Sequence, residues 1–265
     1  MADLILHGID RGQGFDFGRT SADYARYRDI YPATLYRKLR EFGIVRPGER
    51  ILDVGTGTGV LPRNLYDAGA KWTGADLSEE QISMARKLSQ GMEIDYVAAP
   101  AERLPVPDRS FELMTACQCF WYFDIPAFLA ELRRVVVPGG RFCKIIMNWL
   151  PHESGIAAET EKLVLQYNPA WSGGGYVPEP FAVPDWTAGV LEPETFHHYR
   201  EGLPFSIDSW CGRIRACRGV GASLSAPEVK QFDRALRESL ERNGEESFEI
   251  PHYIRIEVYR LIGPR

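Results

Sequence analysis

The segment ILDVGTGTG, residues 51–59, constrains the fold of this chain more than any other segment. Apolar residues and one acid, Asp53, lead into three glycines at alternate positions, Gly55, Gly57 and Gly59. An apolar run that ends in glycines is typical of a buried strand whose carboxyl end meets both a ligand and the first turn of a helix. We therefore expect an α/β fold with a ligand at this strand end.

The neighbouring sequence repeats this strand-then-helix rhythm. Short apolar segments are expected as strands at 49–55, 71–77, 94–100, 111–120 and 141–149. Helices are expected at 33–43, 58–70, from Ser78 onward and at 125–136, and the SEEQ segment predicts a capping box between Ser78 and Gln81. Such alternation predicts a Rossmann-like, mostly parallel sheet with helices on both faces.

The rhythm breaks after residue 149. Residues 150–193 are dense in Pro, Gly and aromatic residues, which predicts a long ordered loop or lid. Strands at 194–206 and 250–263 and helices at 208–219 and 226–244 follow. We predict a single domain over 1–265, with an N-terminal lid segment (1–32), a ligand-binding core (33–149), a lid insertion (150–193) and a C-terminal part that completes the sheet (194–265).

Composition limits the partners. The formal net charge is −5, which disfavours nucleic acid, and the sequence has no run of about 18 apolar residues such as a membrane helix needs. The 5 cysteines follow no disulfide spacing, which predicts free thiols in the cytoplasm. Cys117 and Cys119 lack a second Cys/His pair, so we expect no metal. These features predict a small-molecule substrate, no nucleic acid or membrane partner, and a monomer or homodimer.

Three ligand classes use a glycine-rich strand end, and the spacing separates them. A P-loop needs Lys and then Ser/Thr after its last glycine, but Val60 follows Gly59, and the same Val60 replaces the third glycine of a dinucleotide fingerprint. A tight turn without a ligand would explain one glycine better than three. Asp53 would repel a pyrophosphate and attract an ammonium group, such as that of S-adenosylmethionine. Asp76 lies about 20 residues on, where a carboxylate can accept ribose hydroxyls of this cofactor or of NAD.

Four segments carry a resemblance to a known family: ILDVGTGTG, GADLSEEQISMARK, APAERLPVPDRSFELMTACQCFWYF and LRRVVVPGGRF. In order and spacing they resemble class I S-adenosylmethionine-dependent methyltransferases, notably the small-molecule branches similar to ubiquinone/menaquinone C-methyltransferases and trans-aconitate methyltransferases. The match covers roughly residues 24–148. The resemblance implies a seven-stranded sheet with an antiparallel last strand, and methyl transfer from S-adenosylmethionine to a small molecule by in-line displacement.

The resemblance also implies roles for individual residues. The glycines would line the methionine and ribose, with Asp53 near the ammonium, Asp76 on the ribose hydroxyls and Leu77 on the adenine. Glu102 or a backbone amide would take the adenine-edge contact that an acid at the position of Pro100 often makes in the family. The full set of expected cofactor residues is Tyr27, Arg28, Asp53, Gly55, Thr56, Gly57, Gly59, Asp76, Leu77, Gln81, Ala101, Glu102, Cys117 and Gln118. Of these, Tyr27 and Arg28 would close over the methionine carboxylate.

A general base is not identified by the sequence. Trp121 stands where many relatives have His, and the remaining candidates are Tyr122, His197 and His198. Near the C-terminus Arg213, Arg215 and Arg218 flank a predicted helix; a solvated charged face is the expectation, and a clamp for an anionic substrate is the alternative. Two other functions stay open, a non-catalytic S-adenosylmethionine-binding module and an NAD-dependent oxidoreductase, the second disfavoured by Asp53 and Val60.

Overall fold

The structure is a computed structural model that describes residues 4–6 and 8–263. The chain divides into two compact units. Unit 1 comprises Met1–Ile30, Asn148–Glu179 and Arg200–Tyr253, and unit 2 comprises Tyr31–Met147, Pro180–Tyr199 and Ile254–Arg265. The expected core, residues 33–149, therefore lies almost entirely in unit 2, whereas the expected lid insertion is divided between the units. The domain boundaries given above stay predictions.

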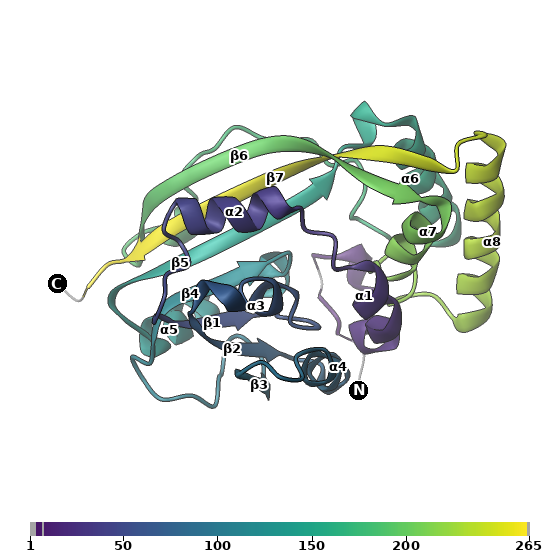
Figure 1. Cartoon of the computed structure of the whole chain (residues 1–265). Coiled ribbons are helices and arrows are strands. Elements are labelled where there is room, and N and C mark those ends of the chain that lie inside the picture. The colour runs from purple at the N-terminus through teal and green to yellow at the C-terminus, as the bar shows by residue number, and fades with distance from the viewer. Residues whose placement is uncertain (1–3, 7, 264–265) are drawn as a thin grey trace. The chain divides into compact units, whose positions relative to one another are not determined.

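The described residues form one seven-stranded sheet with the order β3-β2-β1-β4-β5-β7-β6 (Figure 1). The strands are β1 (Arg50–Val54), β2 (Lys71–Asp76), β3 (Ile94–Ala98), β4 (Phe111–Cys117), β5 (Val136–Trp149), β6 (Leu191–Ser206) and β7 (Ser247–Leu261). The first five strands pair in parallel. In Figure 1 the arrowhead of β7 points opposite to that of β5. The predicted Rossmann-like sheet with an antiparallel last strand is confirmed.

Unit 2 has one helix before β1 and three in the connections between its strands. They are α2 (Ala33–Glu41), α3 (Val60–Asn64), α4 (Glu79–Leu88) and α5 (Ile125–Val135). Asp124 caps helix α5, because its side chain accepts from the Ala127 amide, and Phe128 of the helix packs on Phe142 of β5 with ring centroids 5.3 Å apart. The expected helix at 58–70 is wrong beyond Asn64, because the chain changes there to a 3₁₀ turn that ends at Gly69 in a left-handed conformation.

Unit 1 is mainly helical. Its helices are α1 (Ser21–Tyr27), α6 (Gly155–Tyr167), α7 (Ile207–Arg215) and α8 (Ala226–Arg242). The expectation of a loop throughout 150–193 is wrong at α6, where Ser154 caps a helix by accepting from the Ala157 amide. The density of Pro and Gly that suggested a loop begins only after this helix. Residues 168–184 contain no helix or strand in the described chain.

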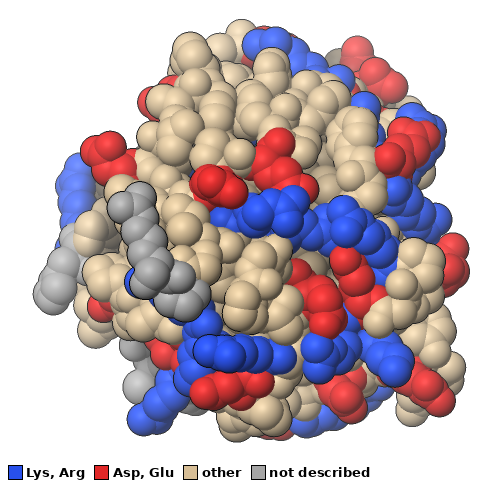
Figure 2. All heavy atoms as spheres, turned by 90° about the vertical axis from the view of Figure 1, so that its left-hand side faces the viewer, with Lys and Arg blue, Asp and Glu red and all other residues tan. Residues whose placement is uncertain are grey.

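Short 3₁₀ helices complete the secondary structure of the described residues. They are η1 (Asp10–Gly12), η2 (Phe17–Thr20), η3 (Tyr66–Ala68), η4 (Phe120–Tyr122), η5 (Pro151–Glu153) and η6 (Asp185–Thr187). Among the helices that the structure describes, none combines the length and apolar character needed to cross a membrane. On the face shown in Figure 2, basic and acidic side chains lie interspersed, so this face does not present a uniformly basic surface.

Candidate functional site

The glycine loop after β1 has a backbone that requires glycine. Gly55, Gly57 and Gly59 all have positive φ angles, of 64°, 57° and 74°. A Cβ atom at Gly59 would collide with the hydroxyl of Tyr96 from β3, and one at Gly55 would lie 2.6 Å from Cys119 Sγ. The loop therefore needs glycine both for conformation and for space, and it leads directly into α3 at Val60.

Asp76, the last residue of β2, joins this loop to the start of α4. Its Oδ2 accepts from the Gly57 amide at 2.8 Å, and its Oδ1 accepts from the Ser78 amide at 2.9 Å. Burial raises the pKa of Asp76 from its ordinary value, while the two amide donors act in the opposite direction. The carboxylate that the sequence assigned to ribose hydroxyls is thus already held beside the glycine loop.

Asp53, on β1, is buried with an exposed fraction of 2%. Its Oδ1 accepts from the hydroxyl of Thr115, its partner residue on β4, at 2.6 Å. Burial raises the pKa of Asp53 to about 6, although the hydrogen bond from Thr115 lowers it. Above that pH the residue supplies a buried negative charge at the carboxyl end of β1.

The segment after Asp76 presents an apolar side chain and a capped helix. Leu77 is 48% exposed, which is unusual for a leucine beside a buried strand. Ser78 Oγ accepts from the Gln81 amide at 3.3 Å, so this hydrogen bond of the predicted capping box is confirmed. Gln81 itself is buried on α4. An exposed leucine next to the carboxylate of Asp76 offers an apolar surface for a ring.

Ala101 and Glu102 follow β3 and lie near the start of α5. Ala101 belongs to the buried core of unit 2, and Glu102 is half-buried. Glu102 Oε1 accepts from the Asp124 amide at 2.9 Å, so this side chain ties its loop to the N-terminus of α5. The expected contact of Glu102 with an adenine edge stays a prediction.

The turn after β4 is anchored to neighbouring strands. Gln118 has a positive φ of 62°. Its side-chain amide donates to the Met147 carbonyl and its Oε1 accepts from the Met147 amide at 2.9 Å. Cys119 Sγ donates to the Val54 carbonyl at 3.1 Å, and burial raises the pKa of this thiol well above its ordinary value. Gln118 and Cys119 therefore hold the turn against β5 and β1, while Cys117 is buried at the end of β4.

These residues fit S-adenosylmethionine. Asp53 and Asp76 lie on the adjacent parallel strands β1 and β2, and Asp53 is paired with Gly74, two residues before Asp76. Both carboxylates and the glycine loop therefore lie at the carboxyl-terminal edge of the sheet. Cys119 and Tyr96 already occupy the space that a Cβ atom would need at Gly55 and at Gly59, so the loop keeps a bare backbone there. A carboxylate, bare backbone and an exposed leucine suit a ribose, an amino-acid moiety and an adenine. In the described residues no three His, Cys, Asp or Glu side chains cluster to hold a metal ion.

Comparisons with known proteins identify the family of this chain. Residues 52–143 match the methyltransferase domain family. A demethylmenaquinone methyltransferase from Thermus thermophilus is 29% identical over 188 residues, or 64% of this chain and 84% of that protein. A malonyl-[acyl-carrier protein] O-methyltransferase from Pseudescherichia vulneris is 31% identical over 221 residues, or 78% of each chain. The chain is a class I S-adenosylmethionine-dependent methyltransferase.

Solved structures show the same fold. A protein from Bacillus halodurans that is assigned as a methyltransferase superposes with a TM-score of 0.55 at 19% identity, over 87% of this chain and 100% of that chain. One from Anaeromyxobacter dehalogenans, assigned as a type II methyltransferase, gives a TM-score of 0.51 at 25% identity over 88% of this chain and 96% of that one. The methyltransferase fold is therefore confirmed, and S-adenosylmethionine is the cofactor of this enzyme.

The three candidate bases lie in different parts of unit 2. Tyr122 is half-buried in η4, directly after the β4 turn. His197 and His198 lie on β6, where His197 contacts Phe42 of α2 with ring centroids 5.0 Å apart and His198 is exposed. Burial and the nearby Lys38 lower the pKa of His197. The order of the sheet places β6 four strands from β1, which at about 5 Å per strand separates the two strands laterally by about 20 Å.

Tyr27 and Arg28 belong to unit 1 of the methyltransferase. Tyr27 packs against Gly212 of α7 and donates to Asp208 Oδ2 at 3.1 Å. The guanidinium of Arg28 lies 4.8 Å from the centroid of the Tyr24 ring. Their expected closure over the methionine carboxylate stays a prediction.

The aromatic residues of the expected lid are distributed over both units. In unit 1, Trp171 is buried against Gly219. In unit 2, Phe181 stacks on Phe196 at 4.2 Å, and Trp186 packs on Phe120 at 4.8 Å. Each of these rings therefore has a packing role within its own unit, and the predicted mobility of the segment remains a prediction.

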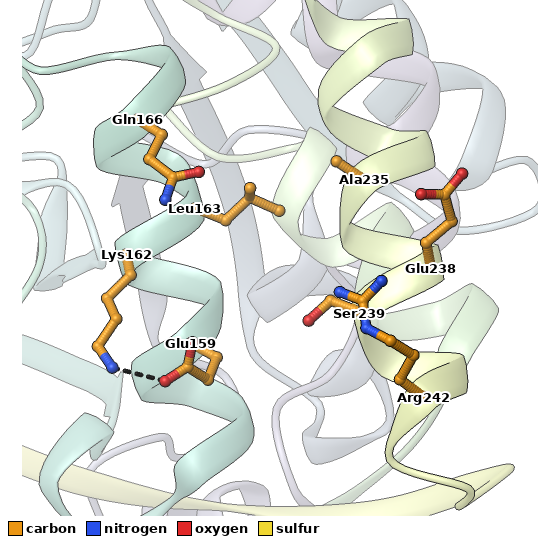
Figure 3. A pocket seen from close by; sticks show the side chains of 8 residues that line it. All are labelled: Glu159, Lys162, Leu163, Gln166, Ala235, Glu238, Ser239 and Arg242. Atoms are coloured by element: carbon orange, nitrogen blue, oxygen red, sulfur yellow. Dashed lines mark hydrogen bonds and ion pairs between the residues drawn. The ribbon is translucent and has the colours of Figure 1, made fainter.

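A polar groove of about 280 Å³ lies between α6 and α8 of unit 1 (Figure 3). Four residues of α6 and four of α8 line it: Glu159, Lys162, Leu163, Gln166, Ala235, Glu238, Ser239 and Arg242. Lys162 forms an ion pair with Glu159 on its own helix. None of the predicted site residues lies in this groove.

Two residues that shape the loop were missed by sequence reasoning. Tyr96 occupies the space above Gly59, and its hydroxyl is 2.9 Å from Ser89 Oγ. Thr115 supplies the hydroxyl that Asp53 accepts. A polar residue within the buried part of β4, Leu113–Cys117, is the sequence signal that could have identified Thr115, whereas nothing local marks Tyr96.

Proposed function

We propose that this methyltransferase transfers the methyl group to a small-molecule acceptor, and that the residues predicted from the sequence in unit 2 bind the cofactor. The observation that carries the site assignment is the position of Asp76, whose carboxylate bridges the Gly57 and Ser78 amides. In that place it can exchange these donors for ribose hydroxyls without moving from the strand end. The backbone of the glycine loop then faces the remainder of the cofactor.

Each part of the cofactor has a proposed partner. Asp76 accepts from the ribose hydroxyls, Leu77 covers the adenine, and Asp53 provides negative charge for the ammonium group. Bound S-adenosylmethionine supplies a methyl group on a sulfonium, which the acceptor atom attacks in line with the breaking bond. The chain positions the reactants and excludes water, and positioning alone can be worth roughly 7–11 kcal/mol.

We assign no general base. The distance of β6 from β1 argues against His197 and His198, and Tyr122 remains a candidate because it directly follows the β4 turn. An acceptor that is already nucleophilic needs no base, so the absence of an assigned base is compatible with transfer. The named relatives act on a demethylmenaquinone and on a malonyl group carried by acyl-carrier protein, and we carry over only the class of a small acceptor group.

We place the reaction in the cytoplasm. All five cysteines of this chain are free thiols, as expected in a reducing compartment. The acidic net charge of −5 also supports a small-molecule acceptor over a nucleic acid. Whether the enzyme is a monomer or a homodimer is tested by light scattering at micromolar concentration.

The cofactor site is tested by replacing Asp76 with Ala. The variant loses a charged acceptor worth roughly 1.5–3 kcal/mol, so the affinity for S-adenosylhomocysteine should fall about ten- to a hundredfold. Isothermal titration calorimetry measures the affinity. Asp95→Ala, which removes an exposed carboxylate from the neighbouring β3, is the matched control and should bind like the parent enzyme. Equal affinity in Asp76→Ala and the parent would remove Asp76 from the site.

A further inference from the structure

The arginines near the end of α7, in unit 1, are engaged in contacts within the protein. Arg215 exposes only 18% of its side chain and forms an ion pair with Asp23 at 3.0 Å. Arg218 exposes only 10% and forms an ion pair with Asp10 at 2.8 Å. Arg213 is buried. The expectation of a solvated charged face is therefore wrong, and the ion pairs neutralise charges that the alternative, a clamp for an anionic substrate, would need.

A basic side chain of unit 2, Arg255 on β7, is placed differently. Its Nε is buried and lies 2.6 Å from Glu257 Oε1, but in an orientation that forms no hydrogen bond. Nη1 and Nη2 donate no hydrogen bond to any residue that the structure describes, and 17% of the side chain is exposed. The N–H donors of this guanidinium are therefore unused by the described part of the chain.

The acid beside Arg255 has other hydrogen-bond partners. Glu257 is buried, and its Oε2 accepts from Lys144 Nζ at 3.1 Å and from the Tyr259 hydroxyl at 2.6 Å. Two basic side chains, Lys144 and Arg255, thus share one carboxylate, and only Lys144 is hydrogen-bonded to it. A guanidinium whose buried Nε lacks a hydrogen bond is poorly satisfied by this carboxylate alone.

Strand pairing places Arg255 toward the edge of the sheet that carries the glycine loop. Strand β7 is the neighbour of β5 and runs antiparallel to it (Figure 1). Glu257 is level with Lys144 of β5, because their side chains are hydrogen-bonded. Arg255 comes two residues earlier on β7 and so lies closer to the carboxyl end of β5. Near that end the Ile145 carbonyl accepts from the Gln118 amide, so Arg255 is level with the turn after β4.

Aromatic rings of unit 2 pack around this group of charges. Lys144 Nζ lies 5.1 Å from the centroid of the Phe120 ring and 5.7 Å from that of Trp186. Trp186 also packs on Tyr259, with ring centroids 5.6 Å apart. Phe120 belongs to η4, which follows the β4 turn. Because apolar rings exclude water, an anion beside these charges is screened less than it would be on an open surface.

We propose that Arg255 binds a carboxylate of the methyl acceptor through Nη1 and Nη2, with its Nε kept beside Glu257. The two terminal nitrogens of a guanidinium present parallel donors that match the two oxygens of a carboxylate. A phosphate dianion would bring more negative charge close to Glu257, so a carboxylate is the favoured anion. The proposal rests on the proposed function, because it assigns this ligand to the acceptor.

The order of the strands supports the acceptor rather than the cofactor. Strand β7 is two strands from β4 and three from β1, so at about 5 Å per strand it lies about 10 Å and about 15 Å away laterally. The carboxylate and the ammonium of methionine share one carbon atom, so a cofactor with its ammonium near Asp53 of β1 cannot place its carboxylate at β7. A small acceptor that reacts above the β4 turn can span about 10 Å.

The position of Arg255 in the chain agrees with this assignment. The match to the methyltransferase domain family covers residues 52–143 and contains the glycine loop, Asp53 and Asp76, whereas Arg255 lies outside it. Residues that set the choice of acceptor are expected outside the part that enzymes with different acceptors share.

The proposal is tested with the full chain in the presence of S-adenosylhomocysteine. The probes are benzoate, succinate and glutarate, each compared with its neutral amide by isothermal titration calorimetry at pH 7. We expect at least one carboxylate to bind while its amide does not. Arg255→Met should weaken that binding at least tenfold and leave the affinity for S-adenosylhomocysteine within about twofold. Methyl phosphate should bind more weakly than the best carboxylate.

Control variants separate binding from folding. Arg260→Met removes a 46% exposed arginine from the same strand and should bind the carboxylate like the parent. Arg255→Met leaves Glu257 its hydrogen bonds from Lys144 and Tyr259, so it should fold. Arg255→Lys keeps the charge but loses the parallel donors and should bind several-fold more weakly; it also replaces Arg255→Met if that variant does not fold. Thermal unfolding of each variant reports its stability.

The proposal is overturned if none of the carboxylates binds, if the Arg255 variants bind them like the parent, or if methyl phosphate binds more tightly than every carboxylate. It is also overturned if the Arg255 variants weaken S-adenosylhomocysteine binding as much as carboxylate binding, because Arg255 would then serve the cofactor. Failure of the parent to bind S-adenosylhomocysteine would contradict the cofactor site instead, and the carboxylate titration without it would still decide the assignment of Arg255.

Discussion

The carboxylates of the glycine-loop region in unit 2 and those near α7 in unit 1 have different partners. Asp53 and Asp76 accept hydrogen bonds from a threonine hydroxyl and from backbone amides, which are uncharged donors. Asp10 and Asp23, by contrast, form ion pairs with Arg218 and Arg215. In the first region negative charge remains available to a ligand, whereas in the second it is neutralised by the protein itself.

The charge of the partner decides whether a carboxylate can still attract a ligand. A buried carboxylate with uncharged donors keeps an electrostatic potential that attracts a cation, while an ion pair largely cancels its own field. In unit 1 the buried guanidinium of Arg213 lies against the ring of Trp149 and donates to the thiol of Cys217. The four predictions below alter one side of this comparison at a time.

The largest effect on cofactor binding is expected from Gly59→Ala in the glycine loop. The left-handed backbone costs the new side chain roughly 1–2 kcal/mol, and its Cβ collides with the Tyr96 hydroxyl. We expect the affinity for S-adenosylhomocysteine to fall more than about a hundredfold, measured by calorimetry. Gly91→Ala is the control, since Gly91 also has a positive φ, of 86°, but no atom lies within 4 Å of the position that its Cβ would take. Similar losses in both variants would show that backbone strain alone matters.

The next effect concerns the ion pair of unit 1. Arg218→Met leaves the carboxylate of Asp10 buried without its cation, which should lower the free energy of unfolding by about 3–5 kcal/mol. Urea denaturation measures this change. The double variant Asp10→Asn/Arg218→Met carries no stranded charge and should recover part of the loss. If Arg218→Met were as stable as the parent, the ion pair would not be neutralising the buried charge of Asp10. The contrast between ion-paired carboxylates in unit 1 and carboxylates with uncharged donors in unit 2 would then be wrong.

A third prediction uses the pKa of Asp53, which burial raises to about 6 from an ordinary 3.8. The folded state holds this proton more tightly than the unfolded state, so the contribution of Asp53 to stability falls as pH rises from about 4 to about 6. The total is roughly 2–3 kcal/mol, at about 1.4 kcal/mol per pH unit. Over the same range cofactor affinity should rise, because ionised Asp53 attracts the ammonium group.

Asp53→Asn is the reference for this pH dependence. Unfolding free energies of the parent and the variant, measured from pH 4 to pH 8, should differ in slope between pH 4 and pH 6 and run parallel above pH 7. Parallel curves over the whole range would show that Asp53 has an ordinary pKa, and a charge available to the cofactor would then need another source.

The smallest effect is expected at Leu77. Because its side chain is 48% exposed, Leu77→Ala should leave the free energy of unfolding within about 0.5 kcal/mol. If an adenine packs on it, loss of the apolar contact should weaken S-adenosylhomocysteine binding by about three- to tenfold. Leu88→Ala, at a 38% exposed leucine of α4, controls for general loss of apolar surface. Equal binding by all three proteins would contradict the adenine contact.

Sequence patterns were sufficient where the determinants are local. The alternation of apolar strands and helices predicted the sheet, and the spacing of Gly55, Gly57 and Gly59 predicted a bare loop at the end of β1. Asp76 was also found from spacing, because the end of a neighbouring parallel strand must meet the same edge of the sheet. The capped start of α4 at Ser78 follows from short-range hydrogen bonding.

Local patterns failed where neighbouring signals compete. Helix α6 was hidden by the Pro- and Gly-rich residues that follow it, although Ser154 provides a regular helix start. The predicted helix after Gly59 stops at Asn64, where packing and a left-handed Gly69 favour a tighter turn. In both cases composition over a long window concealed a short element.

Tertiary structure alone decided which side chains meet. Three contacts join residues on different elements: Tyr96 lies over Gly59, Gln118 donates to Met147, and Arg213 packs on Trp149. No spacing rule predicts them, because the chain between the partners sets only their sequence separation and the packing of strands and helices sets their distance. The sequence of this methyltransferase therefore determines its mostly parallel sheet with an antiparallel last strand, and it predicts the carboxylates that meet a ligand. The burial and partners of each charge, on which the choice between structural and binding roles depends, follow only from the folded chain.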